Sequence, residues 1–282
     1  METLQNALKI LRNAGNLKDD SFDIAQVALA LACLDKGGAD MTAYQAHLDH
    51  LVSQIEPHRS CDRVEDQLKI LRDILVIQQT YKSVELPANN LMDVIDRRQG
   101  DGLLLGVLYL HLAQKAGWAM MAVDVSGHFL LRLSARDGQL VIDPSRAGQP
   151  CLIHEVKEDF LEDDDLFQDL GLPHDVAETI ALIQALGQPM THREVLLRLQ
   201  HNVKRQQLSK DHVEGAISTL QSMLLFAPQQ ENLWCEIGHL QAERGHLRAA
   251  ITALEVVCDM APENLPASQT TGALRELRMR LN

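Results

Sequence analysis

Residues 93–117 read DVIDRRQGDGLLLGVLYLHLAQKAG, and this stretch decides how the rest of the chain can fold. Residues 103–116 are apolar nearly all round, which predicts a helix that is buried on every side. Gly100 and Gly102 break the chain before this helix, and Gly117 is its expected C-cap. A fully buried helix requires other elements to cover each of its faces.

Short strands are predicted directly after the buried helix. They cover residues 119–125, 128–133 and 139–142, and Asp137-Gly138 is expected to join the last two as a hairpin turn. The sequence therefore predicts an antiparallel sheet packed beside the helix.

The N-terminal part of the chain, residues 3–79, has a helical pattern. Asp20 or Ser21 is expected to cap one of its helices, and Ser60 or Asp62 is expected to open a later one. The sequence does not determine whether these helices cover the cleft of the core.

From residue 191 onward the pattern is helical again, and identical residues recur 34 positions apart. The pairs are Ala216 with Ala250, Leu220 with Leu254, and Pro228 with Pro262. A period of 34 is typical of the tetratricopeptide repeat. In the better copy, the residues expected to pack two antiparallel helices together are Trp234, Gly238, Ala250, Leu254 and Pro262. The preceding copy is degenerate, with Gln200 and Lys204 where tryptophan and glycine are expected.

Composition excludes several classes of function. The 282 residues include 39 acids and 26 bases, giving a net charge of −13, and aromatic residues make up only 4%. We therefore expect no direct nucleic-acid contact. The most apolar run, residues 27–34, is too short to span a bilayer, so no membrane contact is expected. The five cysteines are scattered, with no CxxC pair and no signal peptide before them, which favours a cytoplasmic protein without cofactor or metal.

One segment is strongly acidic. Residues 155–169 carry eight acids and one lysine. Such a block usually forms a solvated face, and the alternative is a docking site for a basic partner.

The order of motifs resembles a known family. Asp93–Gly100 before the buried helix, Gly127-His128-Phe129 and Ile142-Asp143-Pro144 resemble the transglutaminase-like core of the bacterial SirB-type proteins. The resemblance implies an α+β, mostly helical fold with a small antiparallel sheet. Its expected parts are an N-terminal helical region at 1–80, a transglutaminase-like core at 81–175 and tetratricopeptide-like repeats at 191–282.

The same resemblance implies where a catalytic triad would lie. In active members of the wider superfamily, a cysteine at the entrance of the buried helix acts with a histidine and an aspartate on successive strands. A helix N-terminus and a neighbouring imidazole both favour the thiolate, and the carboxylate orients the imidazole. Here His128 and Asp143 match the histidine and the aspartate, but the nucleophile position falls at Gly102.

The residues leave some alternatives open. An even number of loop residues would place His128 and Asp143 on one face of the sheet, but the sequence does not fix whether they are in contact. Cys61 or Cys151 could in principle replace the missing nucleophile. His47 and His50 lie three apart on one predicted helix, but the loop around Pro57 is not expected to bring His58 and Cys61 back to complete a metal site.

We therefore favour a protein without enzyme activity, which binds a protein or peptide partner through its helical repeats. The alternative is a hydrolase or acyl transferase that retains His128 and Asp143 as a dyad, with water or another cysteine as the nucleophile.

Overall fold

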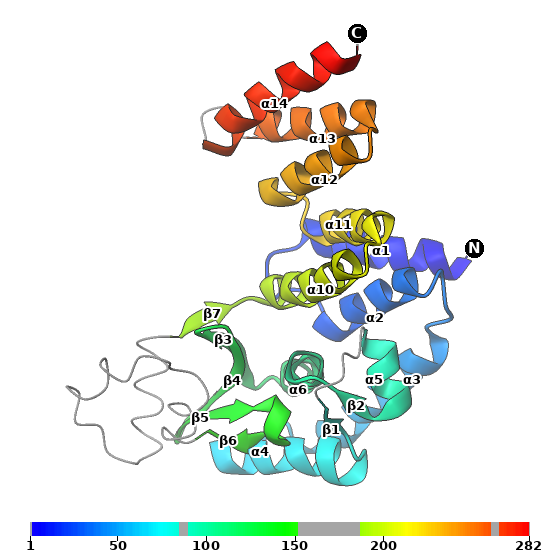
Figure 1. The fold of residues 1–282 in the computed structure, drawn as a ribbon. Coiled ribbons are helices and arrows are strands. Elements are labelled where there is room, and N and C mark those ends of the chain that lie inside the picture. Colours follow the sequence, from blue (N-terminus) through cyan, green and yellow to red (C-terminus); the bar gives the residue numbers. More distant parts are fainter. Residues whose placement is uncertain (1, 85–89, 152–186, 261–264, 282) are drawn as a thin grey trace, which may run out of the picture. The chain divides into compact units, whose positions relative to one another are not determined.

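The computed structural model describes residues 2–84, 90–151, 187–260 and 265–281, shown in Figure 1. These residues group into two compact units. The first unit comprises residues 1–7 and 18–196, and the second comprises residues 8–17 and 197–282. The first unit contains both the N-terminal helices from residue 18 onward and the sheet. The acidic segment 155–169 lies outside the described residues.

The first unit is built around helix α6 (Gly102–Ala116), which is buried at all but three of its positions. Asp101 caps its start, and Gly117 ends it with a left-handed backbone at φ 77°. The helices that pack against α6 are α2 (Ile24–Asp35), α3 (Thr42–Ile55), α4 (Val64–Arg72) and α5 (Leu91–Arg97). The predicted all-round burial of this helix is confirmed.

An antiparallel sheet covers the remaining side of α6 (Figure 1). Within the described residues its strand order is β6-β5-β4-β3-β7, with bounds β3 (Ala119–Val125), β4 (His128–Ala135), β5 (Gly138–Asp143), β6 (Gln149–Pro150) and β7 (Gln188–Met190). The α+β, mostly helical class with a small antiparallel sheet is therefore confirmed. Two short parallel strands, β1 (Lys82–Ser83) and β2 (Gln99–Gly100), pair separately from this sheet.

The hairpin turn between β4 and β5 lies one residue earlier than predicted. Ala135 pairs with Gly138, so Arg136 and Asp137 form the turn. The Asp137 carboxylate accepts the backbone N–H of Val64 at 2.9 Å and so caps the start of α4. Helix α4 therefore begins at Val64, and not at Ser60 or Asp62, because its cap comes from a residue 73 positions away.

The cap of α2 also differs from the prediction. Asp23, and not Asp20 or Ser21, accepts the backbone N–H groups of Ala25 and Gln26. Asp20 is used elsewhere: it has a left-handed backbone at φ 63°, and its carboxylate accepts the backbone N–H of His192. By residue type, Asp20 and Asp23 are equally suited to cap α2. The contact of Asp20 with His192 leaves the cap to Asp23.

Asp23 also ties α2 to α6 through two side chains. Its carboxylate lies 2.8 Å from His111 Nδ1 and 2.8 Å from Lys115 Nζ. Burial by itself would raise the pKa of Asp23, but the contacts with His111 and Lys115 outweigh it and hold that pKa well below its usual range. The polar groups of α6 therefore face the start of α2.

The second unit is a row of helices, with bounds α10 (His192–Ser209), α11 (Val213–Phe226), α12 (Glu231–Glu243), α13 (Leu247–Met260) and α14 (Leu265–Leu281). Helix α10 begins in the first unit, and α1 (Glu2–Asn16) contributes to both. Consecutive helices α11 to α14 contact one another in chain order (Figure 1).

The approach of α12 to α13 depends on one glycine. A Cβ atom added at Gly238 would lie 2.5 Å from Leu254 Cδ2 and 2.6 Å from its Cγ. Ala250 is fully buried beside this contact, and its carbonyl oxygen lies 3.5 Å from the same added atom. Pro262 lies outside the described residues.

Replacing this glycine tests the packing. We expect Gly238→Ala to lower the free energy of unfolding by about 1–3 kcal/mol, because the added methyl group overlaps Leu254. The matched control is Gly272→Ala on α14, where an added Cβ meets nothing within 4 Å. That change should raise stability by about 0.5–1 kcal/mol through helix propensity. Urea unfolding of both variants measures the difference, and equal effects would contradict the packing described here.

Candidate functional site

The start of α6 is the position that the family resemblance assigns to a nucleophile. Asp101 caps the helix, and its carboxylate accepts the backbone N–H of Leu104 at 2.8 Å. Burial raises the pKa of Asp101, and the N–H groups of Leu104 and Leu103 oppose that rise. Gly102 follows as the first helical residue and has no side chain to react.

The space beside Gly102 is filled by Ser145. A Cβ atom added at Gly102 would lie 3.2 Å from Ser145 Cβ and 3.4 Å from its backbone nitrogen. A contact of 3.2 Å is tighter than most Cβ atoms show, so a side chain at this position would require Ser145 to shift by a few tenths of an ångström. This neighbour could not be predicted from the sequence, because Ser145 comes from the turn after β5, more than 40 residues away.

Asp143 organises that turn. It is the last residue of β5, and it caps the short 3₁₀ helix Pro144–Arg146. Its Oδ1 atom accepts the backbone N–H of Ser145 at 2.7 Å and the Ser145 hydroxyl at 2.6 Å. Arg146 Nε lies 3.7 Å from Oδ2. Only 7% of Asp143 is exposed, so the carboxylate is committed to its own turn.

His128 begins β4 after the tight turn Ser126-Gly127, and it pairs with Val125. The next residue, Phe129, packs on α6, because a Cβ atom added at Gly106 would lie 2.3 Å from Phe129 Cε1. Successive side chains of a strand point to opposite faces. The His128 side chain therefore leaves the sheet on the face opposite α6.

The register of β4 and β5 fixes the relation between His128 and Asp143. The last described pair of this ladder is Leu131 with Ile142, so the next position would place Asp143 opposite Leu130. His128 and Asp143 thus lie on one face of the sheet, two residues out of register. Diagonal neighbours of this kind are typically about 7–8 Å apart.

Cys151 is too distant to replace the missing nucleophile. Its backbone N–H bonds to the carbonyl of Val141, and Val141 pairs with Arg132 on β4. Arg132 is four residues from His128, or about 13 Å along the strand, and Cys151 is two strand spacings, about 10 Å, to the side. This alternative is therefore excluded by the register.

Cys61 is excluded in the same way. It lies just before Val64, whose N–H is held by Asp137 at the far end of the β4–β5 hairpin. His128 is at the opposite end of β4, and the strand from His128 to Ala135 spans about 23 Å. The remaining cysteine of the first unit, Cys33, is fully buried in α2, and burial raises the pKa of its thiol.

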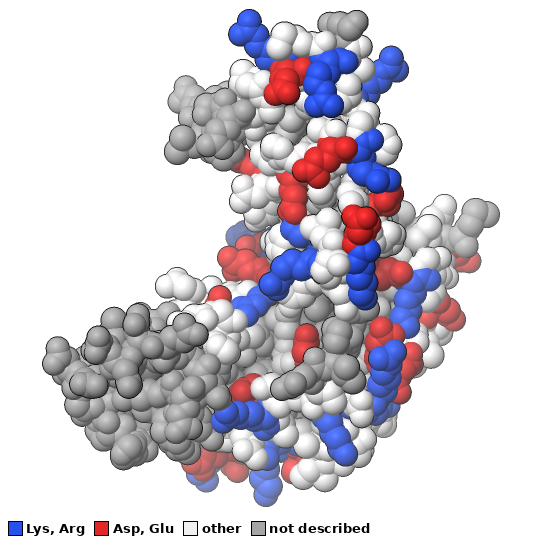
Figure 2. All heavy atoms as spheres, in the orientation of Figure 1, with Lys and Arg blue, Asp and Glu red and all other residues white. Residues whose placement is uncertain are grey.

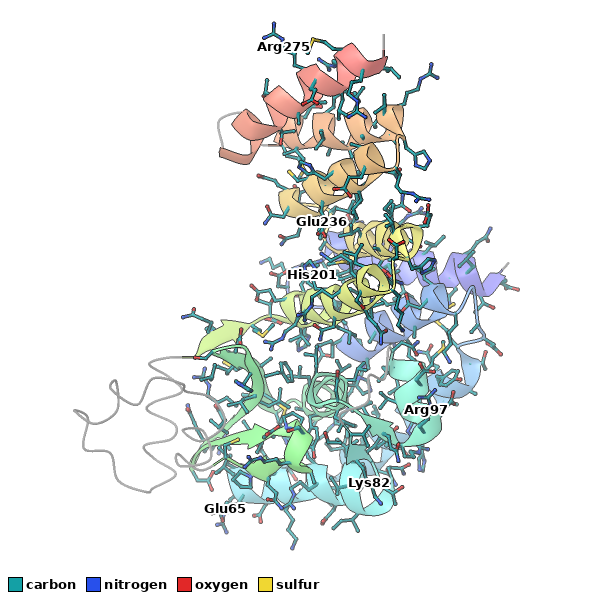
Figure 3. All side chains as sticks on the ribbon, in the orientation of Figure 1. Glu65, Lys82, Arg97, His201, Glu236 and Arg275 are labelled. Carbon is teal, nitrogen blue, oxygen red and sulfur yellow. The ribbon has the colours of Figure 1, made fainter. Side chains whose placement is uncertain are left out.

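A cluster of three side chains lies at the Arg-Arg-x-Gly turn, and the sequence did not predict it. Arg98 Nη1 donates to the Tyr81 hydroxyl at 2.6 Å and to His47 Nε2 at 2.7 Å. The guanidinium also lies over the Tyr81 ring, 5.0 Å from its centroid. Arg98 has a left-handed backbone at φ 55°, which directs its side chain back toward His47. Arg97, the other arginine of this turn, is exposed and labelled in Figure 3.

The electrostatics of the cluster keep its groups in fixed protonation states. Burial, Arg98 and His50 lower the pKa of His47 to about 4. Burial raises the pKa of Tyr81 to about 12, and Arg98 opposes that rise. A neutral imidazole is also what a hydrogen bond from Arg98 to Nε2 requires. Within the described residues no group of three His, Cys, Asp or Glu side chains is arranged to hold a metal ion.

The buried helix, its entrance and the following sheet define a class of fold, and comparison with known proteins agrees. A family model described as the transglutaminase-like superfamily matches residues 42–201. That range is more than half of the chain, which therefore belongs to the transglutaminase-like superfamily.

Relatives match along almost the whole chain. UPF0162 proteins from two strains of Xylella fastidiosa, Temecula1 and 9a5c, are each 24% identical over 290 residues, covering 97% of this chain and 96% of theirs. A crystal structure of menin, whose title concerns its binding site for the Mixed Lineage Leukemia protein, aligns with a TM-score of 0.42 and 12% identity. That alignment covers 90% of this chain and 69% of menin's, and it is too weak to carry an argument. No helix among the described residues combines the length and the apolar character needed to cross a bilayer.

The His47 cluster predicts a specific pH dependence. The folded pKa of about 4 lies below the ordinary value of 6.5, so the unfolded state binds a proton more readily. The contribution of His47 to stability is therefore fully present above pH 6.5 and is lost as the pH falls toward 4. Arg98→Met removes one cause of the low pKa, so NMR titration should show the pKa of His47 moving upward. Arg97→Met, at the neighbouring exposed position, should leave it in place, and equal shifts in both variants would refute the assignment.

Proposed function

We propose that this protein is a non-catalytic member of the transglutaminase-like superfamily that acts through contacts with a protein or peptide. The observation that carries this proposal is the entrance of α6. Gly102 supplies no nucleophile, and Ser145 occupies the space in front of it. Phe129 packs on α6 at Gly106, and His128 leaves the sheet on the opposite face.

The periodic burial of the second unit supports tetratricopeptide-like repeats. Ala216 and Ala250 are both fully buried, and so are Leu220 and Leu254, at 0% and 1% exposure. The degenerate copy keeps the same phase, because Gln200 and Lys204 are also buried, at 1% and 8% exposure. Three of the four paired positions are therefore buried in both copies, whereas Trp234, the counterpart of Gln200, is only half-buried; this partial match supports the SirB-type architecture.

Lys204 shows how the degenerate copy is accommodated. Its ammonium group lies 2.6 and 2.7 Å from the two carboxylate oxygens of Glu236 on α12, which Figure 3 labels. A buried lysine needs such a partner, since an unpaired buried charge is costly. The degenerate copy thus has a lysine paired with Glu236 at the position where the repeat pattern expects a glycine.

The last two helices offer a surface for a partner. A hollow of about 600 Å³ lies between α13 and α14, and its lining includes Cys258, Leu274 and Met279. Met279 is 67% exposed, an unusual state for a large apolar side chain. Arg275 lines the same hollow and is labelled in Figure 3. On the visible face of the molecule, acidic and basic side chains are interspersed (Figure 2).

Thiol reactivity tests the non-catalytic part of the proposal. We expect iodoacetamide at neutral pH to alkylate all five cysteines slowly, with buried Cys33 among the slowest, when each site is followed by mass spectrometry. His128→Ala should leave every rate unchanged. One rapidly labelled cysteine that slows in His128→Ala would establish an activated thiol and overturn the proposal.

Site-specific crosslinking tests the partner surface. A photoreactive amino acid at Met279 should give discrete protein adducts in an extract of the source cells, and Arg275→Glu should weaken them. The matched control is the same amino acid at Ile77, which is 69% exposed in the first unit. Identical adducts from both positions, or none from Met279, would argue against a partner at this hollow.

A further inference from the structure

The positive charge of Arg98 has no carboxylate to balance it. Among the described residues, the contacts of this side chain are its hydrogen bonds to His47 and Tyr81 and its position over the Tyr81 ring. Neither neighbour is an anion at neutral pH, because the pKa of His47 is about 4 and that of Tyr81 is about 12. Arg98 is also only partly exposed. A charge that is partly withdrawn from water is costly without a counter-ion, so this cation requires an explanation.

The carboxylates that precede Arg98 in the same segment are engaged by other groups. Asp93 lies 2.7 Å from Lys36 Nζ, and Asp96 accepts the Tyr44 hydroxyl at 2.9 Å. Neither carboxylate forms an ion pair with Arg98. The turn therefore supplies this arginine with no counter-ion of its own.

The guanidinium of Arg98 keeps two donor atoms unused. Both of its side-chain hydrogen bonds start from Nη1, which carries two hydrogens and is therefore fully used. Within the described residues Nε and Nη2 have no partner, and neither belongs to the unpaired polar atoms that are shielded from solvent. Nε and Nη2 form one edge of the planar group. Such an edge donates two parallel hydrogen bonds, which match the two oxygens of a carboxylate.

This edge is held in a fixed place from both ends of the residue. At the backbone, Arg98 has a left-handed conformation at φ 55°, and its carbonyl oxygen accepts the N–H of Lys82 at 3.0 Å. At the tip, His47 and Tyr81 hold Nη1. A left-handed backbone is unfavourable for a residue with a side chain, and such strain is concentrated at binding sites. A guanidinium that is already held in place loses little freedom when it binds an anion.

The charge of the cluster favours a carboxylate over a phosphate. Arg98 is its single fixed cation, because the hydrogen bond that His47 accepts requires a neutral imidazole and Tyr81 carries no charge. One guanidinium edge balances the single negative charge of a carboxylate. A phosphate monoester carries about −1.5 to −2 charges at neutral pH and would remain partly unbalanced here.

We propose that the free edge of Arg98 binds a carboxylate, with one oxygen accepting from Nε and the other from Nη2. His47 and Tyr81 are positioning residues, since they hold the guanidinium and do not touch the ligand. An acidic side chain or the end of a peptide chain supplies this group, and so does a small free acid. In the first case the proposal rests on the proposed function and names one group of the partner.

Probes that differ in one group test the proposal on the full chain. They are acetate, N-acetylalanine, which ends in a carboxylate as a peptide does, and N-acetylalanine amide, in which an amide replaces that carboxylate. The contact with the Tyr81 ring assigns the Arg98 Nε–H signal in an NMR spectrum. At constant ionic strength, we expect both acids to shift this signal in a saturable way, with a Kd on the order of 10 mM. The uncharged amide should leave the signal in place.

Substitutions then locate the site, with binding followed by saturation-transfer NMR on the probe. Arg98→Lys keeps the charge but loses the two parallel donors, so it should weaken N-acetylalanine binding about tenfold. The matched control is Arg136→Met, which removes one exposed charge from the turn between β4 and β5 and should leave binding unchanged. Thermal unfolding shows whether each variant folds. The contrast between the acids and the amide on the unaltered chain is decisive even if Arg98→Lys does not fold.

The comparison of acids also identifies the source of the carboxylate. Tighter binding of N-acetylalanine than of acetate would assign it to a peptide, and equal binding would assign it to a small acid. Equal shifts by acids and amide, an unmoved Arg98 signal at about 100 mM N-acetylalanine, tighter binding of methyl phosphate than of either acid, or full affinity in Arg98→Lys would overturn the proposal. Adducts at Met279 are a separate measurement, so failure of carboxylate binding and failure of the proposed function are distinguishable.

Discussion

The burial of α6 on all sides is the constraint on which the rest of the first unit depends. A helix of leucines, valines and alanines has no surface to turn to water, so helices α2 to α5 and the sheet must each cover a part of it. Two glycines permit the closest of these approaches. Gly106 receives the ring of Phe129, and Gly102 receives the turn that carries Ser145. Neither position has room for a larger side chain unless its neighbour moves.

The same packing also determines what lies beside Gly102, the position that the family resemblance assigns to a nucleophile. In a catalytic relative, the entrance of the buried helix needs an open space for a thiol and an imidazole directed at it. Here the turn after β5 places Ser145 against Gly102, and Phe129 packs on the helix at Gly106. Asp143 retains a defined role, because it holds this turn through two short hydrogen bonds to Ser145. The aspartate therefore fixes the position of Ser145 beside the start of α6.

The polar groups of α6 gather toward its C-terminal half. His111 and Lys115 meet Asp23, and Gln114 reaches the carbonyls of the preceding loop. These contacts join the helix to the start of α2 and to the loop before it. The entrance of α6 carries Asp101 and the turn of Ser145, whereas a cavity of about 350 Å³ lies at its other end.

The sequence by itself determined the elements whose cause is local. The apolar run of α6, its glycine C-cap, the three strands after it and the helical character of the flanking segments all follow from composition and spacing over a few residues. The absence of a nucleophile at Gly102 is equally a fact of the sequence. Tertiary structure decided what depends on distant partners. Asp137 sets the start of α4, Asp20 is drawn to His192 and leaves the cap of α2 to Asp23, and Arg98 meets His47 and Tyr81. It also decided the register, which places His128 and Asp143 on one face two residues out of register and keeps Cys61 and Cys151 far from His128, because a shift of one pair in a hairpin changes every contact beyond it.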